Sequence, residues 1–390
     1  MNLKKMRTWA EINLDNFKNN IEVIKKHIGN EKMLMAVIKA NAYGHGVTRI
    51  AIEAVNAGCD YLAVACIDEA IQIRKADIDI PVLILSHISE DGIPDLIDYN
   101  IIPTVFNKEM PEKISDYARK INKTVKVHIK LDTGMTRLGF DASKVNETVE
   151  DILYINNLDG IEIEGIFTHF ADADNEGGTF TEEQYLKYKN IVNELEKRGL
   201  DIPVKHTCNS AGIISKKDMH LNMVRAGIIL YGYYPEKYLE NIMPGILPVL
   251  EIKSSVFQIK EVEEDITVGY GRTYKTENKK KIGVIPIGYA DGYSRLLSNK
   301  FYVLVCGKKV NIIGRICMDQ LMVDLTEIDN VCEGTVVTII GKDGENSITA
   351  QDIANELKTI SYEVLCDIGR RIPRIYFKNG KVDSFVNYLE

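Results

Sequence analysis

The sequence places a lysine where an apolar strand should end. Residues 33–38 read Met-Leu-Met-Ala-Val-Ile, and Lys39 follows them directly before a turn that contains Gly44 and Gly46. A lysine that ends a buried strand tends to have a lowered pKa and to form Schiff bases readily. Glycine-rich backbone can approach an anion closely. The segment therefore offers an amine for a carbonyl cofactor and part of a phosphate cradle. A lysine that leaves a strand for solvent would look the same.

Other polar side chains also follow strand-like runs. They are Lys130, Asp132, Arg137, His169, Asn209, Ser210 and Arg225. Each has an ordinary alternative: His169 suits a hydrogen-bonded core histidine, Ser210 a helix N-cap and Arg225 a structural ion pair. Their coincidence at strand ends favours a common site.

The elements that must position these residues alternate in type. Short β-branched runs occur at 33–39, 61–66, 81–86, 101–106, 125–132, 161–169, 203–209 and 222–225, and helical periodicity separates them at 48–57, 68–76, 108–120, 142–155 and 181–198. The segment Thr181–Gln184 resembles a helix start. Eight such alternations predict an N-terminal (β/α)8 TIM-like barrel, whose reactive groups gather at the carboxyl ends of the strands. An open doubly wound sheet is the alternative, but no GxGxxG follows the first strand.

After about residue 245 the pattern changes to alternating strands separated by Gly, Asp and Asn turns. One helix is expected near 350–358, with a capping box from Thr349 to Asp352. We therefore expect an α/β protein with a barrel domain over 12–243 and a mainly antiparallel β domain over 244–390, with which residues 1–11 pair.

Barrels often bind phosphate at the loops after strands seven and eight, where Ser210 and the Gly227 and Ile228 amides fall. A phosphate site combined with Lys39 indicates pyridoxal 5'-phosphate, which acts as an electron sink. The β domain adds three polar segments around Tyr270, Tyr289 and residues 314–319. Hairpin turns with aromatic packing would also explain them.

Composition narrows the function classes. The chain has 390 residues, 45% of them apolar, and a net charge of −8 without a long basic run, which argues against nucleic-acid and membrane-surface partners. Seven scattered cysteines without a CxxC favour free thiols in a reducing cytoplasm and no metal site. The N-terminus lacks the apolar region of a signal peptide, and no apolar run is long enough to span a membrane.

Nine ordered motifs resemble those of the alanine racemase family. They are VIKANAYGHG, KLDTGMTRLGF, GIFTHFADAD, HTCNSAG, VRAGIILYG, VGYGRTY, PIGYADGY, IIGRICMDQ and ISYEVLCDIGRRIPR. The resemblance as a whole runs from Trp9 to Pro373. The resemblance implies a cytoplasmic, PLP-dependent enzyme (isomerase class) that interconverts L- and D-alanine and supplies D-alanine for peptidoglycan. It also implies a head-to-tail homodimer whose active sites take groups from both subunits.

The same resemblance assigns roles to individual positions. Lys39 is expected to carry the cofactor and to act as one base, and Tyr270 of the other subunit as the second. The expected cofactor-binding residues are Tyr43, His169, Asn209, Ser210, Arg225, Gly227, Ile228 and Tyr362. Substrate is expected to meet Arg137, Met318, Tyr270 and Tyr289, with Asp319 and Arg315 in the entryway. Lys130 matches a position that is N-carboxylated in some members.

Three rival functions stay open at this point. A racemase of the same fold could act on serine or other amino acids. A basic-amino-acid decarboxylase of related fold would share the lysine, but an arginine at the pyridine nitrogen and a tyrosine base argue against it. A non-catalytic PLP-binding protein would lack the second base that the β domain provides.

Overall fold

The computed structural model describes residues 6–389 and divides into two compact units. The barrel unit contains Phe17–Ala42 and Val47–Leu247. The β unit contains the N-terminal residues through Asn16, the short segment Tyr43–Gly46, and the chain from Pro248 onward. The division therefore falls within the turn after Lys39, between Ala42 and Tyr43.

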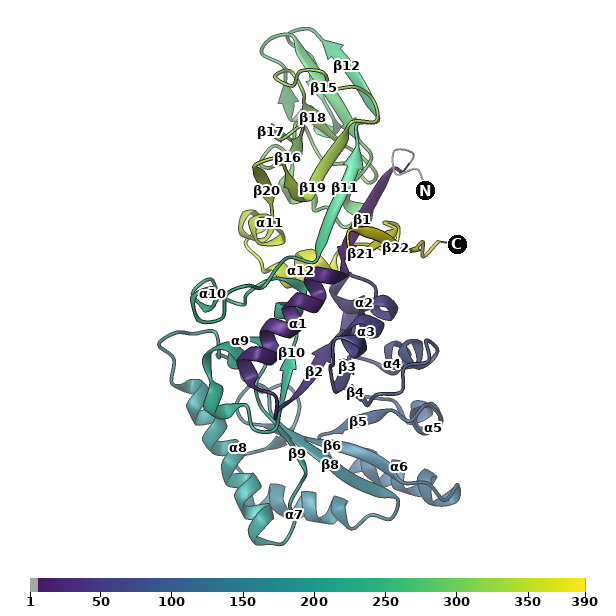
Figure 1. Ribbon diagram of the computed structural model, residues 1–390, viewed down its shortest axis with the longest axis vertical. Helices are drawn as coiled ribbons and strands as arrows, with labels where there is room; N and C mark the ends of the chain where they lie inside the picture. Colours follow the sequence, from purple (N-terminus) through teal and green to yellow (C-terminus); the bar gives the residue numbers. More distant parts are fainter. Residues whose placement is uncertain (1–5, 390) are drawn as a thin grey trace. The chain divides into compact units, whose positions relative to one another are not determined.

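The barrel unit confirms the predicted closed parallel barrel (Figure 1). Within the described residues eight parallel strands form a ring in the order β5-β4-β3-β2-β10-β9-β8-β6, and β6 pairs again with β5. The strands are β2 (Met33–Val37), β3 (Tyr61–Val64), β4 (Val82–Ile84), β5 (Ile102–Val105), β6 (Val125–Asp132), β8 (Ile161–Phe167), β9 (Val204–His206) and β10 (Met223–Ala226), with β7 (Phe140–Asp141) beside β6.

Helices connect these strands, as right-handed parallel crossovers require. They are α1 (Leu14–Ile28), α3 (Val47–Asn56), α4 (Ile67–Arg74), α5 (Ile93–Asp98), α6 (Glu109–Lys120), α7 (Val145–Asn156), α8 (Phe180–Lys197) and α9 (Ser210–Ser215), followed by α10 (Leu239–Ile242). The five predicted helices lie close to their expected ranges. The fifteen-residue α1 was not predicted, and α5, α9 and α10 escaped prediction because they are too short to show a periodic pattern.

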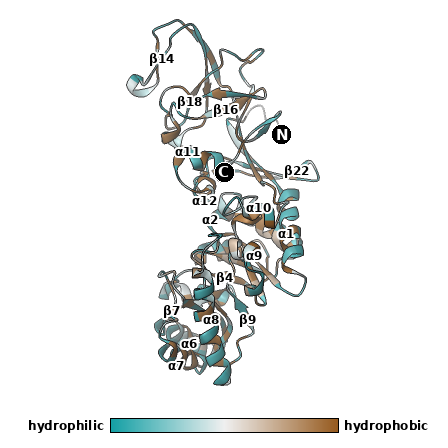
Figure 2. Ribbon diagram, turned by 90° about the vertical axis from the view of Figure 1, so that its left-hand side faces the viewer, coloured by the Kyte–Doolittle hydropathy of each residue, from teal (hydrophilic) through white to brown (hydrophobic). Residues whose placement is uncertain are grey.

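Helix α8 differs in detail from its predicted start. It begins at Phe180 with Thr179 at the N-cap, so Thr181 lies inside the helix, where its buried hydroxyl has no hydrogen-bond partner. Apolar residues such as Tyr188 and Leu195 point into the core, and Figure 2 shows hydrophilic and hydrophobic residues mixed along this helix, as amphipathic packing requires.

The β unit is mainly antiparallel, as predicted. Its main sheet has the order β17-β16-β19-β11-β1-β21-β22, in which only the β1–β21 pair is parallel. The strands are β1 (Thr8–Asn13), β11 (Leu250–Ser255), β16 (Tyr302–Val305), β17 (Lys308–Asn311), β19 (Val336–Asp343), β20 (Asn346–Ile348), β21 (Arg374–Lys378) and β22 (Lys381–Val386). A smaller sheet holds β12 (Gln258–Val262), β15 (Lys280–Ile285) and β18 (Leu321–Asp324), and β13 (Thr267–Val268) pairs with β14 (Tyr274–Lys275).

Two helices belong to the β unit, where the sequence predicted one. Helix α11 (Ala350–Leu357) has the expected capping box: the Asp352 amide donates to the Thr349 hydroxyl at 3.1 Å, and the Thr349 amide donates to the Asp352 carboxylate at 2.8 Å. Helix α12 (Ser361–Cys366) has only six residues and was missed for that reason. Among residues 6–389 no helix is long and apolar enough to cross a membrane, and no cluster of three or more His, Cys, Asp or Glu side chains could hold a metal ion.

Candidate active site

Lys39 lies two residues after the end of β2 and is followed by an unusual backbone segment. Ala40, Asn41, Ala42 and Tyr43 have φ values of 53°, 54°, 54° and 51° and form a left-handed turn. Left-handed helical backbone costs roughly 1–2 kcal/mol for each L-residue. Strain of this kind persists where the surrounding structure enforces it, and it concentrates at functional sites. The strained backbone therefore indicates a functional site at Lys39, independently of the chemistry of the lysine side chain.

Side chains from neighbouring elements hold this turn. The Glu69 carboxylate accepts hydrogen bonds from the amides of Ala40 (2.6 Å) and Ala65 (2.8 Å), which tie the residue after Lys39 to the end of β3. The Asn41 side chain accepts from the Val47 amide at 3.0 Å and closes the turn against α3. Sequence reasoning missed Glu69, since nothing in the local pattern separates it from a solvent-facing helix residue.

Arg225 lies in β10, the strand beside β2, and is buried. Its guanidinium donates to the backbone carbonyls of Thr168 (2.7 Å), Thr207 (2.8 Å) and His206 (3.1 Å), and also to His206 Nδ1 at 2.9 Å. Burial lowers the pKa of Arg225 to about 10, so the group stays cationic at neutral pH. Arg225 is thus an immobilised positive charge at the carboxyl end of the barrel strands.

His169 follows β8 and accepts from this arginine. The Arg225 Nη2 atom lies 3.4 Å from His169 Nδ1. Because arginine only donates, Nδ1 must be the acceptor, and the ring proton belongs on Nε2. Burial and the surrounding charges of Arg225, Lys130, Arg137 and Lys39 lower the pKa of His169 well below its usual value. The imidazole is therefore neutral and offers an Nε2–H donor.

The buried Gln184 of α8 fixes the loop that carries His169. Its amide nitrogen donates to the His169 carbonyl at 3.2 Å and to Thr133 Oγ1 at 3.1 Å, while its oxygen accepts from the Ala171 amide at 2.9 Å. From the sequence Gln184 was interpreted as part of a helix start. In the structure it is a positioning residue of the site.

Lys130, near the end of β6, is almost fully buried. Its ammonium donates to the Leu131 carbonyl at 3.2 Å and lies 5.3 Å from the centre of the Phe167 ring. Burial and the charge of Arg225 lower the pKa of Lys130 to about 7, with a smaller contribution from Arg137. A large neutral-amine fraction at physiological pH is what N-carboxylation by CO2 requires. Arg137 itself is exposed on the loop after β6.

We expect Lys130→Met to change how the free energy of unfolding depends on pH. The lysine titrates near 7 in the folded chain and near 10.4 unfolded. Below pH 7 the folded state buries a full ammonium; between the two values only the unfolded state keeps its proton, so wild-type stability rises with pH. The methionine variant should exceed wild type by a few kcal/mol at pH 6, and the difference should shrink towards pH 9. Denaturant unfolding in CO2-free buffer at both pH values tests this; a pH-independent difference would contradict it.

The loops after β9 and β10 meet, as the sequence predicted for a phosphate site. Asn209 caps α9 by accepting from the Gly212 amide at 3.0 Å. The hydroxyl of Ser210, the first residue of that helix, accepts from the Gly227 amide at 3.0 Å. Ile228 then begins a short 3-10 turn (Ile228–Tyr231). A hydroxyl and two helical-turn N-termini therefore converge, an arrangement that suits an anion.

The β unit carries its own predicted residues. Tyr43 and Tyr362, the latter on α12, have ring centres 6.1 Å apart. Burial raises the pKa of Tyr43 far above its usual value, and the neighbouring Tyr362 and Cys366 add to this. The Tyr43 phenol therefore keeps its proton at neutral pH.

Tyr270 lies at the start of a tight turn between two glycines. Gly269 and Gly271 have φ values of 72° and 70°, and a Cβ on Gly271 would come within 2.5 Å of the Arg315 guanidinium. The positive φ favours glycine at 271, and the Arg315 side chain packs closely against it. The turn presents Tyr270 with 70% of its surface exposed, and the glycines on either side of it lie close to Arg315.

The remaining predicted residues gather around a buried carboxylate that sequence reasoning missed. The amides of Tyr289 and Ala290 donate to the carbonyls of Cys317 (3.1 Å) and Met318 (3.0 Å), so these two segments pack together. Asp291 anchors them: it accepts from the Gly288 amide at 3.0 Å and pairs with Arg7 at 2.5 Å.

The arginine that holds Asp319 also reaches this carboxylate. Arg371 lies 2.8 Å from Asp319 and 3.6 Å from Asp291. In the sequence, only the presence of acidic and basic residues in the Tyr289 and GRRIPR motifs pointed to these ion pairs.

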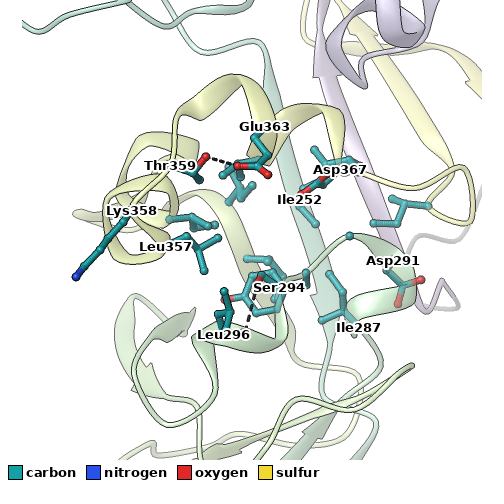
Figure 3. A pocket seen from close by; sticks show the side chains of 18 residues that line it. Ile252, Ile287, Asp291, Ser294, Leu296, Leu357, Lys358, Thr359, Glu363 and Asp367 are labelled. Carbon is teal, nitrogen blue, oxygen red and sulfur yellow. Dashed lines mark hydrogen bonds between the residues drawn. The ribbon is translucent and has the colours of Figure 1, made fainter.

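One cavity of the β unit contains none of the predicted site residues. It has a volume of about 330 Å³ and mostly apolar walls, with Glu363 and Asp367 of the α12 region and Asp291 among its polar lining residues (Figure 3). Tyr362, the neighbouring residue of α12, is not part of the lining. The cavity and the cluster around Tyr289 and Asp319 share one residue, Asp291.

Comparison with known proteins covers both parts of the chain. Residues 12–235 match the family model of the alanine racemase N-terminal domain, and residues 249–376 match that of the C-terminal domain. An alanine racemase of Methanococcus maripaludis is 45% identical over 94% of this chain and 98% of its own length.

Solved structures give the same result. An alanine racemase from Clostridium difficile 630 superimposes with a TM-score of 0.94 at 40% identity, covering 99% of this chain and 100% of that one. A structure from Bartonella henselae, described as an alanine racemase with covalently bound pyridoxal phosphate, gives a TM-score of 0.85 at 28% identity over 95% of this chain and 100% of its own. Together with the lysine, arginine and histidine at the barrel strand ends, these matches show that the chain belongs to the alanine racemase family.

Proposed function

We propose that this protein holds pyridoxal 5'-phosphate and interconverts L-alanine and D-alanine with two bases, Lys39 and Tyr270 of a second copy of the chain. The observation that carries the proposal is the convergence of Lys39, Arg225, His169 and the Ser210–Gly227 contact at one end of the barrel strands. A chain that matches alanine racemases along nearly its whole length supports it.

The donor groups present suit this cofactor. Lys39 provides an amine for an aldehyde, and Asn209 caps the helix that begins at Ser210, whose hydroxyl lies 3.0 Å from the Gly227 amide and would turn to an anion. When bound, pyridoxal phosphate withdraws electrons from the substrate and acidifies its Cα proton. The phosphate ligands we propose are Ser210, the Gly227 and Ile228 amides, and the phenols of Tyr43 and Tyr362.

Arg225 is the proposed partner of the pyridine nitrogen. Because a guanidinium does not readily give up its proton, it can donate a hydrogen bond without protonating the ring. His169 accepts from Arg225 at Nδ1 and keeps its proton on Nε2. That Nε2–H would donate to the Tyr270 oxygen and stabilise it when the tyrosine gives up its proton.

Racemisation requires removal of the Cα proton from one face and delivery of a proton to the other. A single base would have to cross the substrate plane, whereas bases on opposite faces need not move. Lys39 and Tyr270 are chemically distinct candidates for these two positions. The high exposure of Tyr270 within its own chain is consistent with a role in the site of another subunit of a homodimer.

The substrate carboxylate is assigned to Arg137 and to the backbone N–H of Met318. If Lys130 is N-carboxylated, the new carboxylate would orient Arg137. Tyr289 and Tyr270 would narrow the entrance to small side chains. Asp319 and Arg315 would lie further out, where Arg371 and the Gly271 turn respectively hold them.

The wider context of the enzyme is proposed from the same family membership. A supply of D-alanine for peptidoglycan is the cellular role we propose. We also propose domain limits of 12–243 for cofactor binding and 244–390 for the β domain.

The test uses purified full-length protein. We expect a visible absorption band from the lysine-bound cofactor, and L-alanine and D-alanine should interconvert. Borohydride reduction should abolish both the band and the activity. Cofactor binding without exchange of the alanine Cα proton for solvent deuterium would instead indicate a non-catalytic PLP-binding protein.

A racemase of broader specificity is the alternative. A narrow apolar wall discriminates by only about 1–3 kcal/mol per methylene, so serine and other small amino acids are expected to react weakly. A panel of L-amino acids measured by kcat/KM separates the alternatives: alanine should exceed serine, and an equal or higher value for serine or a larger substrate would favour the broad-specificity enzyme.

A further inference from the structure

A line of buried polar side chains continues from Arg225 towards the far side of the barrel core. His206 and His128 have no exposed surface, and Glu164 is 7% exposed. Arg225 Nη1 lies 2.9 Å from His206 Nδ1, His206 Nε2 lies 3.0 Å from His128 Nδ1, and His128 Nε2 lies 3.3 Å from Glu164 Oε2. We call these three residues the His206–His128–Glu164 chain.

The chemistry of its two ends fixes every proton in the chain. Arginine can only donate, so His206 Nδ1 accepts and its proton lies on Nε2. That proton is donated to His128 Nδ1, which leaves the His128 proton on Nε2, facing Glu164. An ionised carboxylate can only accept. Both ends therefore demand the same tautomer of both rings, and neither ring can be protonated without placing two donors face to face.

The electrostatic environment agrees with this assignment. Burial and the nearby Arg225 lower the pKa of His206 well below its usual value. Burial also lowers the pKa of His128, even though Glu164 opposes the change. Burial raises the pKa of Glu164, but hydrogen bonds from His128 and Lys126 outweigh it and leave a value of about 2. The rings are neutral and the carboxylate is ionised.

The backbone is shaped to admit this chain. In the pairing of β6 with β8, Val127 faces Ile163 but His128 faces Gly165, so a bulge leaves Glu164 without a partner across the strands. Bulges of this kind re-aim side chains. A Cβ on Gly165 would come within 2.5 Å of the His128 ring, so only glycine leaves room for it. The Phe167 ring stacks on His206 at 4.7 Å and an 8° angle.

We propose that Glu164 is a positioning residue for Arg225 and acts through the two imidazoles. Its carboxylate holds both rings as Nε2–H tautomers, and His206 Nδ1 is thereby kept as a permanent acceptor that orients the guanidinium. This inference rests on the proposed role of Arg225 at the cofactor. It adds a role for three residues that do not touch substrate or cofactor.

The first test reads the tautomers directly and needs no activity. In protein labelled with ¹⁵N-histidine, long-range ¹H–¹⁵N spectra at pH 7.5 should show both His206 and His128 as neutral Nε2–H forms. An Nδ1–H form or a cationic ring at either position would overturn the proposal. Because this result is independent of turnover, failure of the proposed racemase activity would leave it unchanged.

The second test removes the acceptor. Glu164→Met should redistribute the tautomers and lower kcat about 10- to 100-fold, with KM for alanine within about twofold, since misplacement of a reacting group by about 1 Å can cost that much. Glu164→Gln should restore most of the rate, because its carbonyl can accept from His128. Lys126→Met is the matched control: it removes the 2.7 Å ion pair on the outer oxygen of Glu164 and leaves the chain to Arg225 intact.

Each outcome of the second test decides the proposal. A methionine variant with wild-type kcat would overturn it, as would a Lys126→Met variant as slow as Glu164→Met. If Glu164→Met does not fold, Glu164→Asp, which withdraws the carboxylate by one methylene, replaces it. That variant must then show lower kcat, and an unchanged value would equally overturn the proposal.

Discussion

A mixture of Lys39→Ala and Tyr270→Phe proteins should recover activity that neither variant has alone. The racemase activity of each variant should fall by up to about 10⁴-fold, because each lacks one base and Lys39→Ala also lacks the amine that holds the cofactor. If each site combines Lys39 of one chain with Tyr270 of the other, a mixed dimer contains one intact site and one doubly altered site. Random re-association of equal amounts should then restore about a quarter of wild-type activity per chain.

The measurement requires dissociation and re-association of the two variants, followed by an alanine racemisation assay. The control is the double variant Lys39→Ala/Tyr270→Phe mixed with each single variant, which should gain nothing. Recovery distinguishes a shared site from a site within one chain, because in the latter case no mixture contains both bases together. A result at the level of the single variants would refute the shared arrangement while leaving each base assignment to be tested separately.

Tyr270→Phe should affect removal of the Cα proton from the two enantiomers unequally. Lys39 remains in this variant and should still remove the proton from D-alanine, whereas removal from L-alanine should fall about 10²- to 10⁴-fold. The overall racemisation rates cannot reveal this difference. L- and D-alanine are equally stable, so kcat/KM must fall by the same factor in both directions.

Exchange of the alanine Cα hydrogen with solvent deuterium reveals the difference between the two enantiomers. In deuterium oxide, incorporation of deuterium into recovered D-alanine should persist in the phenylalanine variant, and incorporation into recovered L-alanine should nearly stop. Arg272→Lys is a suitable control, since Arg272 lies in the same turn and donates to Thr267 at 3.1 Å. Equal loss of exchange for both enantiomers would show that Tyr270 does not serve one face of the substrate.

Much of this protein could be predicted from local sequence patterns. Alternating strand and helix patterns predicted the barrel, because strands buried on both faces give short continuous apolar runs, whereas helices buried on one face repeat apolar residues every three to four positions. Polar residues at strand ends, such as Lys39, His169 and Arg225, could be assigned to one rim because parallel strands in a barrel all end on the same side. The capping box at Thr349 and Asp352 is a local hydrogen-bond pattern and was also predictable.

Other features depend on contacts between residues far apart in the chain. Gln184 looked like part of a helix start, yet it holds the His169 loop because barrel closure brings α8 beneath that loop. The left-handed turn after Lys39 has no glycine in its first four residues, and it is held by Glu69 of α4 and by a hydrogen bond from the Val47 amide to the Asn41 side chain.

The His206–His128–Glu164 chain shows the same limit most clearly. The sequence gives no sign that these three residues, on three different strands, are in contact. The bulge that turns Glu164 inward depends on how β6 and β8 are paired, and local sequence does not reveal that pairing. Residue types and their order along the chain therefore determined the fold and which groups can react. Strand register and close packing decided how those groups are oriented, since hydrogen-bond partners are selected by distances of about 3 Å.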